Sequence, residues 1–362
     1  MVGWIRVYGW GTPMKYVPIL RGKAGELLAL RHTSPEVRSG IRPVLEVVPD
    51  ERLADAVQTF ARQLAEDLPK DLVVTVDCGQ LWQRGAVGTG FPGHAMAWIG
   101  EYLEQWLHRL VPAFRITEPA GALDEIREVQ RTHGQGGCLR LDLGELPTSP
   151  VELTAAVHDT LDAVELAPES VDLVLDTGFL PSRQAAARLV DRALGVLEWA
   201  GAMPWRHIAL AGGSFPASLA AMEPHLIATV HRHEADLWRA VVQRGCRSPV
   251  PDFGDYGIVH PQPPNHGWRG RPNLRYTVGA DWYVLRAAGH AAHDALRLCR
   301  QLADSRYWDP QQGTELPWGD AQIQHRASGL TTRPGGAREW RAWGTSHHLA
   351  AVARSVAVHG VP

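Results

Sequence analysis

The sequence predicts an α/β fold, namely a parallel (β/α)8 barrel of the TIM type with a C-terminal elaboration. Two observations carry this prediction. Short apolar strands alternate with helices of ordinary length through the first two thirds of the chain, and most of these strands end close to an acidic residue. Nearly continuous apolar strands indicate a parallel sheet covered on both faces, and eight such units fit a closed barrel better than an open sheet.

An open Rossmann-type sheet is the alternative fold. A dinucleotide-binding sheet needs a GxGxxG turn after a strand, and no predicted strand is followed by one. The glycine pairs Gly136-Gly137 and Gly212-Gly213 have a different spacing. The barrel is therefore the predicted architecture.

The strands and helices can be followed from Tyr16 onward. Eight apolar runs are predicted strands: residues 16–20, 41–48, 72–77, 113–118, 138–143, 172–176, 207–211 and 256–260. Amphipathic stretches with apolar residues three and four apart lie between most of them and predict the helices. Residues 273–287 then predict a hairpin, residues 292–308 a helix, and the segment up to Gly336 a loop. We therefore predict a barrel over residues 1–265 and an extension over residues 266–362 that packs on it within the same domain.

Composition and charge limit the classes of function. The chain has 362 residues, 45% of them hydrophobic, and a net charge of -3, so bulk nucleic acid is not an expected partner. Four scattered cysteines fit neither a disulfide framework nor a CxxC zinc site. No apolar run approaches the roughly 20 residues that span a bilayer, and the first residues do not resemble a signal peptide. A cytoplasmic protein that does not bind membranes is the expectation.

Acidic residues lie near the carboxyl ends of five predicted strands: Glu46, Asp77, Glu118, Asp142 and Asp176. Barrel enzymes keep their chemistry at this end, so the five carboxylates should meet around one cavity. Repulsion among them requires a cation, and we expect the first three to bind Mg²⁺ or Mn²⁺, which prefer oxygen ligands. Asp142 and Asp176 are the candidates for catalysis. Helix capping is the alternative role for each of these residues.

Basic residues form a second candidate group. Lys23 directly follows the first strand, and Arg140 lies two residues before Asp142 on the same strand face, where we expect it to neutralise that carboxylate. Guanidinium groups bind phosphate or carboxylate through two parallel hydrogen bonds. The predicted residues for binding a small anionic ligand are Lys23, Arg140, Arg232, Arg275, Tyr276 and Arg341. Solvated loops and structural ion pairs are the alternative reading.

His347 and His348 are adjacent candidates for general acid or base catalysis. Neighbouring residues on a helix point about 100° apart, so at most one of them should enter a given site. A role in helix capping or packing is the alternative.

Short motifs in a fixed order run through nearly the whole chain. They are Tyr16-Val17-Pro18-Ile19-Leu20, Lys23, Gly25-Glu26, Arg232-x-Glu234 with Trp238, Gly254-Asp255-Tyr256-Gly257, Arg275-Tyr276-Thr277, Gly319-Asp320, Trp340-Arg341, Gly344 and His347-His348. In this order they resemble the beta family proteins, which are named after a phage product and occur in phages and bacteria. The resemblance implies a role in phage-host conflict and a protein partner from a defence operon, but it implies no particular reaction.

Two classes of function follow from these residues. The first is an enzyme, a metal-assisted hydrolase or lyase that acts on a phosphorylated or nucleotide-like small molecule. A glycoside hydrolase is a subtype, because paired carboxylates and tryptophans also suit sugars. The second is a non-catalytic sensor or interaction module in phage defence or counter-defence. Metal and phosphate or sugar in the pocket would favour the enzyme, whereas a pocket filled by the chain's own tail would favour the module.

Overall fold

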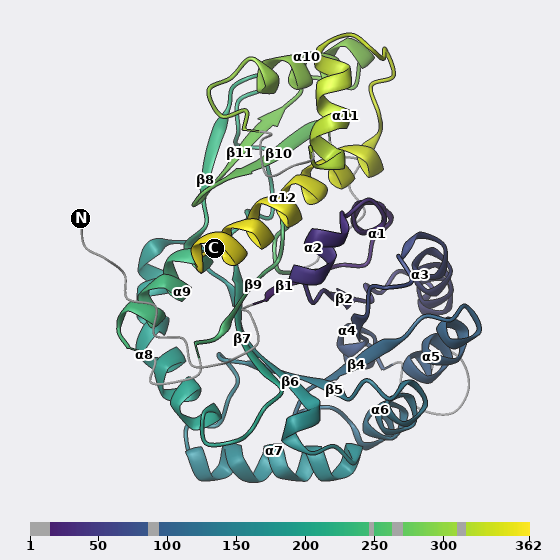
Figure 1. Ribbon diagram of the computed structural model, residues 1–362, viewed down its shortest axis with the longest axis vertical. Coiled ribbons are helices and arrows are strands. Elements are labelled where there is room, and N and C mark those ends of the chain that lie inside the picture. Colours follow the sequence, from purple (N-terminus) through teal and green to yellow (C-terminus); the bar gives the residue numbers. More distant parts are fainter. Residues whose placement is uncertain (1–14, 86–93, 246–249, 263–270, 310–315) are drawn as a thin grey trace.

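Eight parallel strands close a barrel, as predicted (Figure 1). The structure is a computed structural model that describes residues 15–85, 94–245, 250–262, 271–309 and 316–362. The barrel strands are β1 (Tyr16–Leu20), β2 (Val44–Glu46), β3 (Val74–Asp77), β4 (Leu110–Phe114), β5 (Gly137–Asp142), β6 (Val171–Phe179), β7 (His207–Gly213) and β9 (Asp252–Asp255). Each pairs with its neighbour in this order, and β9 closes the ring on β1.

Helices surround the barrel strands, and some of them begin at serine caps. They are α1 (Ala24–Arg31), α2 (Pro35–Gly40), α3 (Leu53–Asp67), α4 (Gly79–Gln83), α5 (Ala95–Gln105), α6 (Ala120–His133), α7 (Pro150–Val164), α8 (Arg183–Ala200) and α9 (His233–Gln243), with a 3-10 turn at Pro168–Ser170. Ser34, Ser149 and Ser182 accept hydrogen bonds from backbone amides at the starts of α2, α7 and α8. Pro35 and Pro150 occupy the first helical position, where a missing N–H costs nothing.

The eighth barrel strand differs from the predicted one. We expected residues 256–260, but the strand is β9, residues 252–255, which pairs with both β1 and β7. Gly254 allows this close packing, because a Cβ atom there would lie 2.7 Å from the Cβ atom of Ala211. Gly257 then adopts a φ of +59° and turns the chain out of the sheet. The strand predicted at 113–118 likewise begins three residues earlier, at Leu110.

A three-stranded antiparallel sheet stands beside the barrel, at the top of Figure 1. Its strands are β8 (Ala228–His231), β10 (Asn273–Val278) and β11 (Asp281–Arg286), and it packs with α10 (Ala292–Ala303) and α11 (Trp318–Ala327). The predicted hairpin is therefore present, whereas β8 was not predicted. The loop expected up to Gly336 is wrong for α11, a helix that begins directly after Pro317.

The last helix, α12 (Ala337–His359), returns to the barrel. It packs against α1, α2 and β1 and lies between α9 and α1 in Figure 1, which is the position of an eighth barrel helix. The added sheet is thus built from chain that leaves the barrel after β7 and after β9, at the carboxyl ends of these strands. The predicted boundary between residues 265 and 266 lies outside the described residues and stays a prediction.

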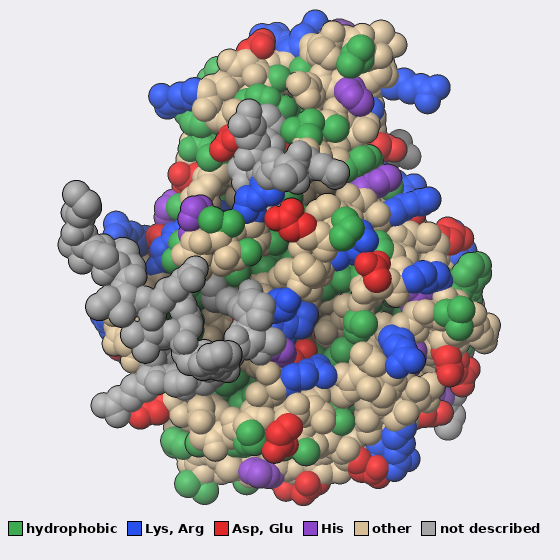
Figure 2. Space-filling view, viewed as in Figure 1, with side chains coloured by type: hydrophobic (Ala, Val, Ile, Leu, Met, Phe, Trp, Pro, Cys, Tyr) green, Lys and Arg blue, Asp and Glu red, His purple; other side chains and the backbone are tan. Residues whose placement is uncertain are grey.

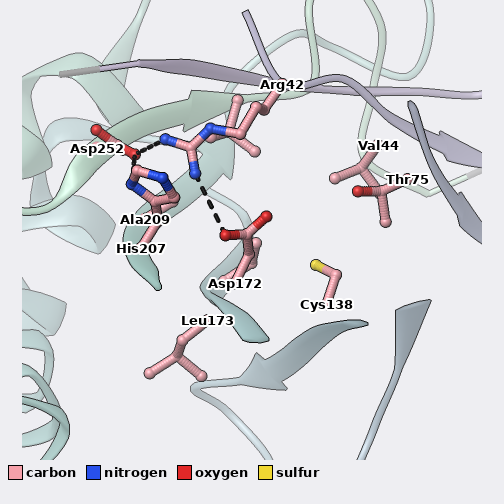
Figure 3. A pocket seen from close by; sticks show the side chains of 11 residues that line it. Arg42, Val44, Thr75, Cys138, Asp172, Leu173, His207, Ala209 and Asp252 are labelled. Atoms are coloured by element: carbon pink, nitrogen blue, oxygen red, sulfur yellow. Dashed lines mark hydrogen bonds and ion pairs between the residues drawn. The ribbon is translucent and has the colours of Figure 1, made fainter. Parts of the chain in front are cut away.

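The barrel interior has three layers. Inward side chains such as Val17, Val44 and Val174 form an apolar middle layer, separate from the larger core between strands and helices. At the amino ends of the strands, Arg42 bonds Asp252 at 2.6 Å and Asp172 at 3.3 Å around a cavity of about 10 Å³ (Figure 3). A space of this size holds about one water molecule. A second charged layer closes the carboxyl end.

His207 in the amino-end layer should make the fold sensitive to acid. Burial, reinforced by the charge of Arg42, lowers the pKa of His207 from 6.5 to about 4. The neutral imidazole is therefore the folded form, so its contribution to stability is present above pH 6.5 and is lost as the pH falls toward 4. We expect this loss to be roughly 3 kcal/mol.

Denaturant unfolding at several pH values measures this effect. His207→Asn cannot be protonated, so between pH 6.5 and 4 its unfolding free energy should fall by less than that of the unmodified chain. His158→Asn, at an exposed position on α7, is the matched control and should follow the unmodified chain. Parallel curves for all three proteins would contradict the assignment.

Candidate functional site

Four barrel strands carry the same local turn, Asp-x-Gly, at or near their carboxyl ends. The turns are Asp77-Cys78-Gly79, Asp142-Leu143-Gly144, Asp176-Thr177-Gly178 and Asp255-Tyr256-Gly257. In each, the Oδ1 atom of the aspartate accepts a hydrogen bond from the glycine amide, at 2.8, 2.7, 2.9 and 2.8 Å respectively. This Asx-type turn uses one carboxylate oxygen and leaves the other for a second partner. The spacing was visible in the sequence, but we did not recognise it as a common unit.

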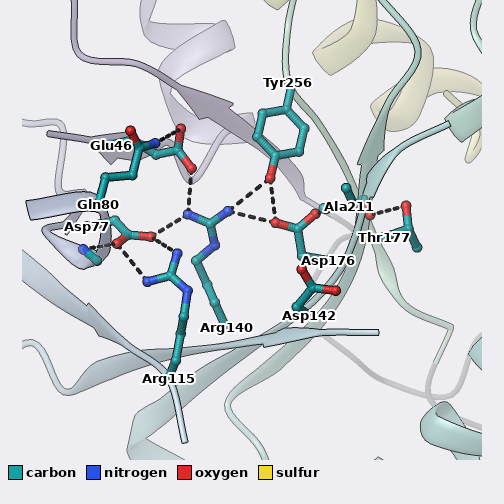
Figure 4. A network of polar contacts seen from close by, with 12 residues as sticks. Glu46, Asp77, Gln80, Arg115, Arg140, Asp142, Asp176, Thr177, Ala211 and Tyr256 are labelled. Carbon is teal, nitrogen blue, oxygen red and sulfur yellow. Dashed lines mark hydrogen bonds and ion pairs between the residues drawn. The ribbon is translucent and has the colours of Figure 1, made fainter. Parts of the chain in front are cut away.

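Arg140 lies at the centre of the carboxyl-end layer (Figure 4). Its guanidinium group donates hydrogen bonds to Glu46 at 3.0 Å and to Asp176 at 2.7 Å, and it also bonds Asp77. Tyr256 completes the ring, since its hydroxyl accepts from Arg140 at 3.1 Å and donates to Asp176 at 2.5 Å. Arg140 thus joins residues from β2, β3 and β6 and the turn after β9 across the barrel.

Arg115 is a second arginine of this layer, and it was missed. It follows β4 and donates two hydrogen bonds to Asp77, at 3.0 and 2.8 Å, and one to Glu118 at 3.1 Å. Gly79 makes this approach feasible, because a Cβ atom there would lie 2.0 Å from the Arg115 guanidinium group. Burial alone would raise the pKa of Asp77, but the charges of Arg115 and Arg140 outweigh it and hold that pKa well below its usual range.

Glu46, Glu118 and Asp142 differ from Asp77. Burial raises the pKa of both Glu46 and Glu118 above the ordinary value, against the opposing charges of Arg140 and Arg115. Asp142 pairs in register with Asp176 but lies exposed at the rim. We expected Arg140 to neutralise Asp142; instead, the partners of Arg140 are the buried groups described above, and the hydrogen bond found at Asp142 comes from its own turn.

These contacts bear on the predicted metal ligands, Glu46, Asp77 and Glu118. Both oxygens of Asp77 already accept hydrogen bonds from guanidinium groups, and one oxygen each of Glu46 and Glu118 does so. A Mg²⁺ or Mn²⁺ ion bound by all three carboxylates would compete with Arg115 and Arg140 at Asp77. The metal site therefore stays a prediction.

A cluster of arginines lies beside the end of β1. Burial lowers the pKa of Arg275 and of Arg341, and the positive charge of a neighbouring arginine adds to the effect in each case. Arg275 donates to the carbonyl oxygen of Ile258, whereas the Nη1 atom of Arg341 is buried and has no hydrogen-bond partner among the described residues. We name Arg21, Arg275 and Arg341 the arginine cluster.

Arg21 links this cluster to the barrel mouth, and it was not predicted. It directly follows β1 and donates to the backbone carbonyls of His260 and Gln262. Burial lowers the pKa of Arg21, against the negative charges of Glu26 and Glu46. Glu26 is the acidic residue that the three arginines share, and its carboxylate also accepts from the backbone amide of Arg21 at 2.9 Å. The positive charge of the cluster therefore exceeds the negative charge.

A cavity of about 120 Å³ adjoins the cluster. Arg21 and Lys23 line one side of it, and Asp50, Asp55 and Gln63 also contribute to its lining. The predicted residue Lys23 is thus placed beside the arginine cluster, at the start of α1. Cations and hydrogen-bond acceptors meet in one small space.

His347 and His348 lie on α12, outside the barrel lumen, where this helix packs between the barrel wall and the added sheet. His347 contacts two acceptors, Asp320 at 3.0 Å and the Thr277 carbonyl at 2.7 Å, so both of its ring nitrogens donate. Burial alone would lower the pKa of His347, but Asp320 raises it above the ordinary value. Tyr276 stacks on the same ring with centroids 3.6 Å apart.

The pKa of His348 is shifted in the opposite direction. Burial lowers its pKa, and the neutral ring donates to Asp255 at 3.0 Å while its Nδ1 atom lies 2.7 Å from the Thr277 hydroxyl. Asp255 also accepts from Tyr16 at 2.6 Å and from Arg232 at 3.1 Å. Tyr16 and Phe253 belong to the core between strands and helices, which places this network on the outer side of the wall.

The predicted site residues thus fall into three groups. Glu46, Asp77, Glu118, Arg140 and Asp176 meet in the carboxyl-end layer, with Asp142 at its rim. Lys23, Arg275 and Arg341 lie together beside β1. Arg232, Tyr276, His347 and His348 form the buried network behind the wall.

Comparison with known families now identifies the chain. The family described as Beta protein matches residues 16–354, which is nearly the whole sequence. The chain belongs to the Beta protein family. The residues of all three groups described above fall within this match, so the arginine cluster and the carboxyl-end layer are parts of a Beta protein barrel.

Other comparisons add little. No curated protein matches the sequence. Among solved structures, the Yersinia pestis DHPS with a pterine-sulfa conjugate is similar to 68% of this chain and 89% of its own, at 12% identity and a TM-score of 0.39. This degree of likeness does not bear on function. Within the described residues, no helix is long and apolar enough to cross a membrane.

Proposed function

We propose that this Beta protein binds a phosphorylated or nucleotide-like small molecule at the carboxyl end of its barrel, through the arginine cluster. The observation that carries the proposal is the excess of positive charge. The three guanidinium groups lie near one shared carboxylate, Glu26, and among the described residues the buried Nη1 atom of Arg341 has no hydrogen-bond partner. A dianionic phosphate would neutralise this charge and accept hydrogen bonds that the described residues do not supply.

The surroundings of the cluster fit a small ligand. The adjoining cavity of about 120 Å³ gives room for the remainder of the molecule, and Asp50, Asp55 and Gln63 offer acceptors for hydroxyl or amino groups. On the face in Figure 2, acidic and basic side chains are interspersed over the part not drawn in grey, rather than gathered into one basic patch. A nucleic-acid duplex would need such a patch.

The carboxyl-end layer favours recognition over turnover. Glu46, Asp77 and Asp176 are engaged by Arg140, which leaves them poor bases for activating water. A hydrolase would have to use Glu118, whose raised pKa suits a general acid, or the exposed Asp142. We therefore propose ligand binding as the main function of the site and hydrolysis as the alternative. A sensor in phage-host conflict would combine such ligand binding with the occurrence of the family in phages and bacteria.

Titration calorimetry with the full chain tests the binding proposal. The probes are pyrophosphate and AMP, with sulfate at equal ionic strength as the anion control. The unmodified chain should bind both phosphate probes more tightly than sulfate, and Arg275→Met and Arg341→Met should each weaken binding by about 10- to 100-fold, because each removes a charge-assisted contact. Phosphate release followed in the same samples by 31P NMR separates a hydrolase from a sensor.

Arg338→Met is the matched control. It lies one turn before Arg341 on α12, its side chain is 49% exposed, and it bonds Asp67 rather than the cluster. This variant should bind the probes as the unmodified chain does. Arg341→Met should not melt earlier, since a buried cation without its own carboxylate contributes little to stability. Arg275→Met also loses the hydrogen bond to the Ile258 carbonyl, so Arg341→Met is the variant that separates binding from folding. Failure of the unmodified chain to bind either phosphate probe, or equal binding by Arg341→Met, would refute the proposal.

A further inference from the structure

A group of metal-ligating side chains outside the arginine cluster lies where the added sheet joins the barrel. His231 ends β8, His233 begins α9, and Asp236 lies in the first turn of that helix. One ring nitrogen of each histidine and one carboxylate oxygen of Asp236 lie within 4.8 Å of one another. Among the described residues, this is the group whose ligand atoms converge in this way.

The geometry of the three side chains is held by partners of their own. His231 Nε2 lies 2.7 Å from Asp236 Oδ2, and the two imidazole rings meet edge to face with centroids 5.0 Å apart. The backbone amide of His233 donates to the Ser214 hydroxyl at 3.0 Å, which fixes the start of the helix. The His233 Nδ1 atom is buried and has no hydrogen-bond partner in the described part of the chain.

Asp281 supplies a second layer of contacts. Its carboxylate lies 2.8 Å from His231 Nδ1, on the side of the ring opposite Asp236. A carboxylate that accepts from one imidazole nitrogen orients the ring and leaves the other nitrogen for a metal ion, an arrangement that metal sites use repeatedly. Asp281 belongs to β11, so the contact also ties the added sheet to the start of α9.

We propose that His231, His233 and Asp236 bind a transition-metal ion of the zinc class. Two imidazoles and one carboxylate suit Zn²⁺ better than Mg²⁺ or Ca²⁺, which prefer sites made only of oxygen. The metal takes the place of the proton that His231 and Asp236 now share. Three protein ligands leave a fourth position for water, and the His231 and Asp236 side chains are 37% and 31% exposed, so solvent reaches the site.

A simple ion pair is the competing explanation for these contacts. His231 could serve only as a cation between Asp236 and Asp281, with Arg239 3.4 Å from the other oxygen of Asp236. That explanation leaves His233 without a role and predicts no affinity for metal. The two explanations therefore differ in a measurable way.

The test uses the full chain after treatment with a chelator that is then removed. Co²⁺ is added while its visible absorption is recorded, because four-coordinate Co²⁺ absorbs far more strongly than the hydrated ion, and Zn²⁺ is then added as a competitor. We expect one Co²⁺ per chain, displaced by one Zn²⁺. His233→Ala and Asp236→Asn should each weaken binding by at least about tenfold, and Asp281→Asn by about 10- to 100-fold.

His293→Ala is the matched control, a histidine 81% exposed on α10 and 3.6 Å from Asp294 but remote from the group. It should bind Co²⁺ as the unmodified chain does. Within the described part of the chain, the His233 side chain makes no hydrogen bond to the barrel. The metal-free melting temperature of His233→Ala should therefore stay close to that of the unmodified chain, and its binding of pyrophosphate should be unchanged. No stoichiometric metal on the unmodified chain, or unaltered affinity in both His233→Ala and Asp236→Asn, would overturn the proposal.

Discussion

Replacing Arg140 with methionine should lower the free energy of unfolding by about 3 to 5 kcal/mol. The arginine side chain is 3% exposed and is bonded to Glu46, Asp77 and Asp176, so its loss leaves three carboxylates facing one another inside the barrel. Methionine has a similar length and fills much of the same space, which limits the cost of an added cavity. The measured effect therefore reports mainly on the unpaired charges.

Thermal and denaturant melts of Arg140→Met measure this effect. Arg62→Met is the matched control, because Arg62 and Glu66 form an ion pair in which both side chains are about half exposed. The control should lose less than about 1 kcal/mol. Equal melting of the two variants would mean that Arg140 does not neutralise the carboxylates of the layer.

Replacing Asp255 with asparagine should cost about 3 kcal/mol or more, the second large effect. The carboxylate is fully buried and accepts hydrogen bonds from Tyr16, Arg232, His348 and the amide of Gly257. An asparagine amide group would point a donor at one of these donors and leave the Arg232 charge less well compensated. The network joins β9, β1, α9 and α12, so the loss should affect the closure of the barrel.

Two further variants make this result specific. Asp71→Asn, in an exposed pair with Arg38, should melt within about 1 kcal/mol of the unmodified chain. His348→Gln keeps a donor toward Asp255 and should lose less than Asp255→Asn. If His348→Gln were the more destabilised variant, the imidazole rather than the carboxylate would be the centre of this network.

Local sequence signals predicted the barrel because most of its strands and helices are marked by patterns of a few neighbouring residues. Apolar strands such as Tyr16–Leu20, the serine caps and the prolines at helix starts all act at short range. β8 escaped prediction because it is four residues long and only half-buried, so its pairing with β11 depends on a contact distant in sequence. The helix α11 escaped because Gly319 and Pro317 indicated a loop.

The carboxyl-end ring could be predicted in part. The carboxyl ends of the strands in a parallel barrel share one rim. This rule predicted that Glu46, Asp77, Glu118 and Asp176 lie together, and they do so in the structure. The cations that neutralise them could not be assigned, because Arg140 reaches across the barrel to β2 and β3 while Arg115 reaches the neighbouring strand β3, and these contacts depend on how the ring closes.

His347 and His348 show what residue spacing along a helix cannot predict, namely where the helix lies in the fold. The 100° between His347 and His348 predicted that they would have different surroundings, and they do. Their place behind the barrel wall follows from the return of α12 to the barrel, a contact between the two ends of the chain. The HxHxxD spacing of His231, His233 and Asp236 was likewise visible in the sequence, but only the fold adds Asp281 to it.

The most direct test of the proposed ligand site is a crystal structure of the full chain grown with pyrophosphate. The account predicts the anion within hydrogen-bond distance of Arg341 Nη1 and of Arg21 or Arg275, with Arg140 still bonded to its carboxylates. Pyrophosphate bound elsewhere, at the amino-end layer or on the surface, with the arginine cluster free of it, would contradict the account.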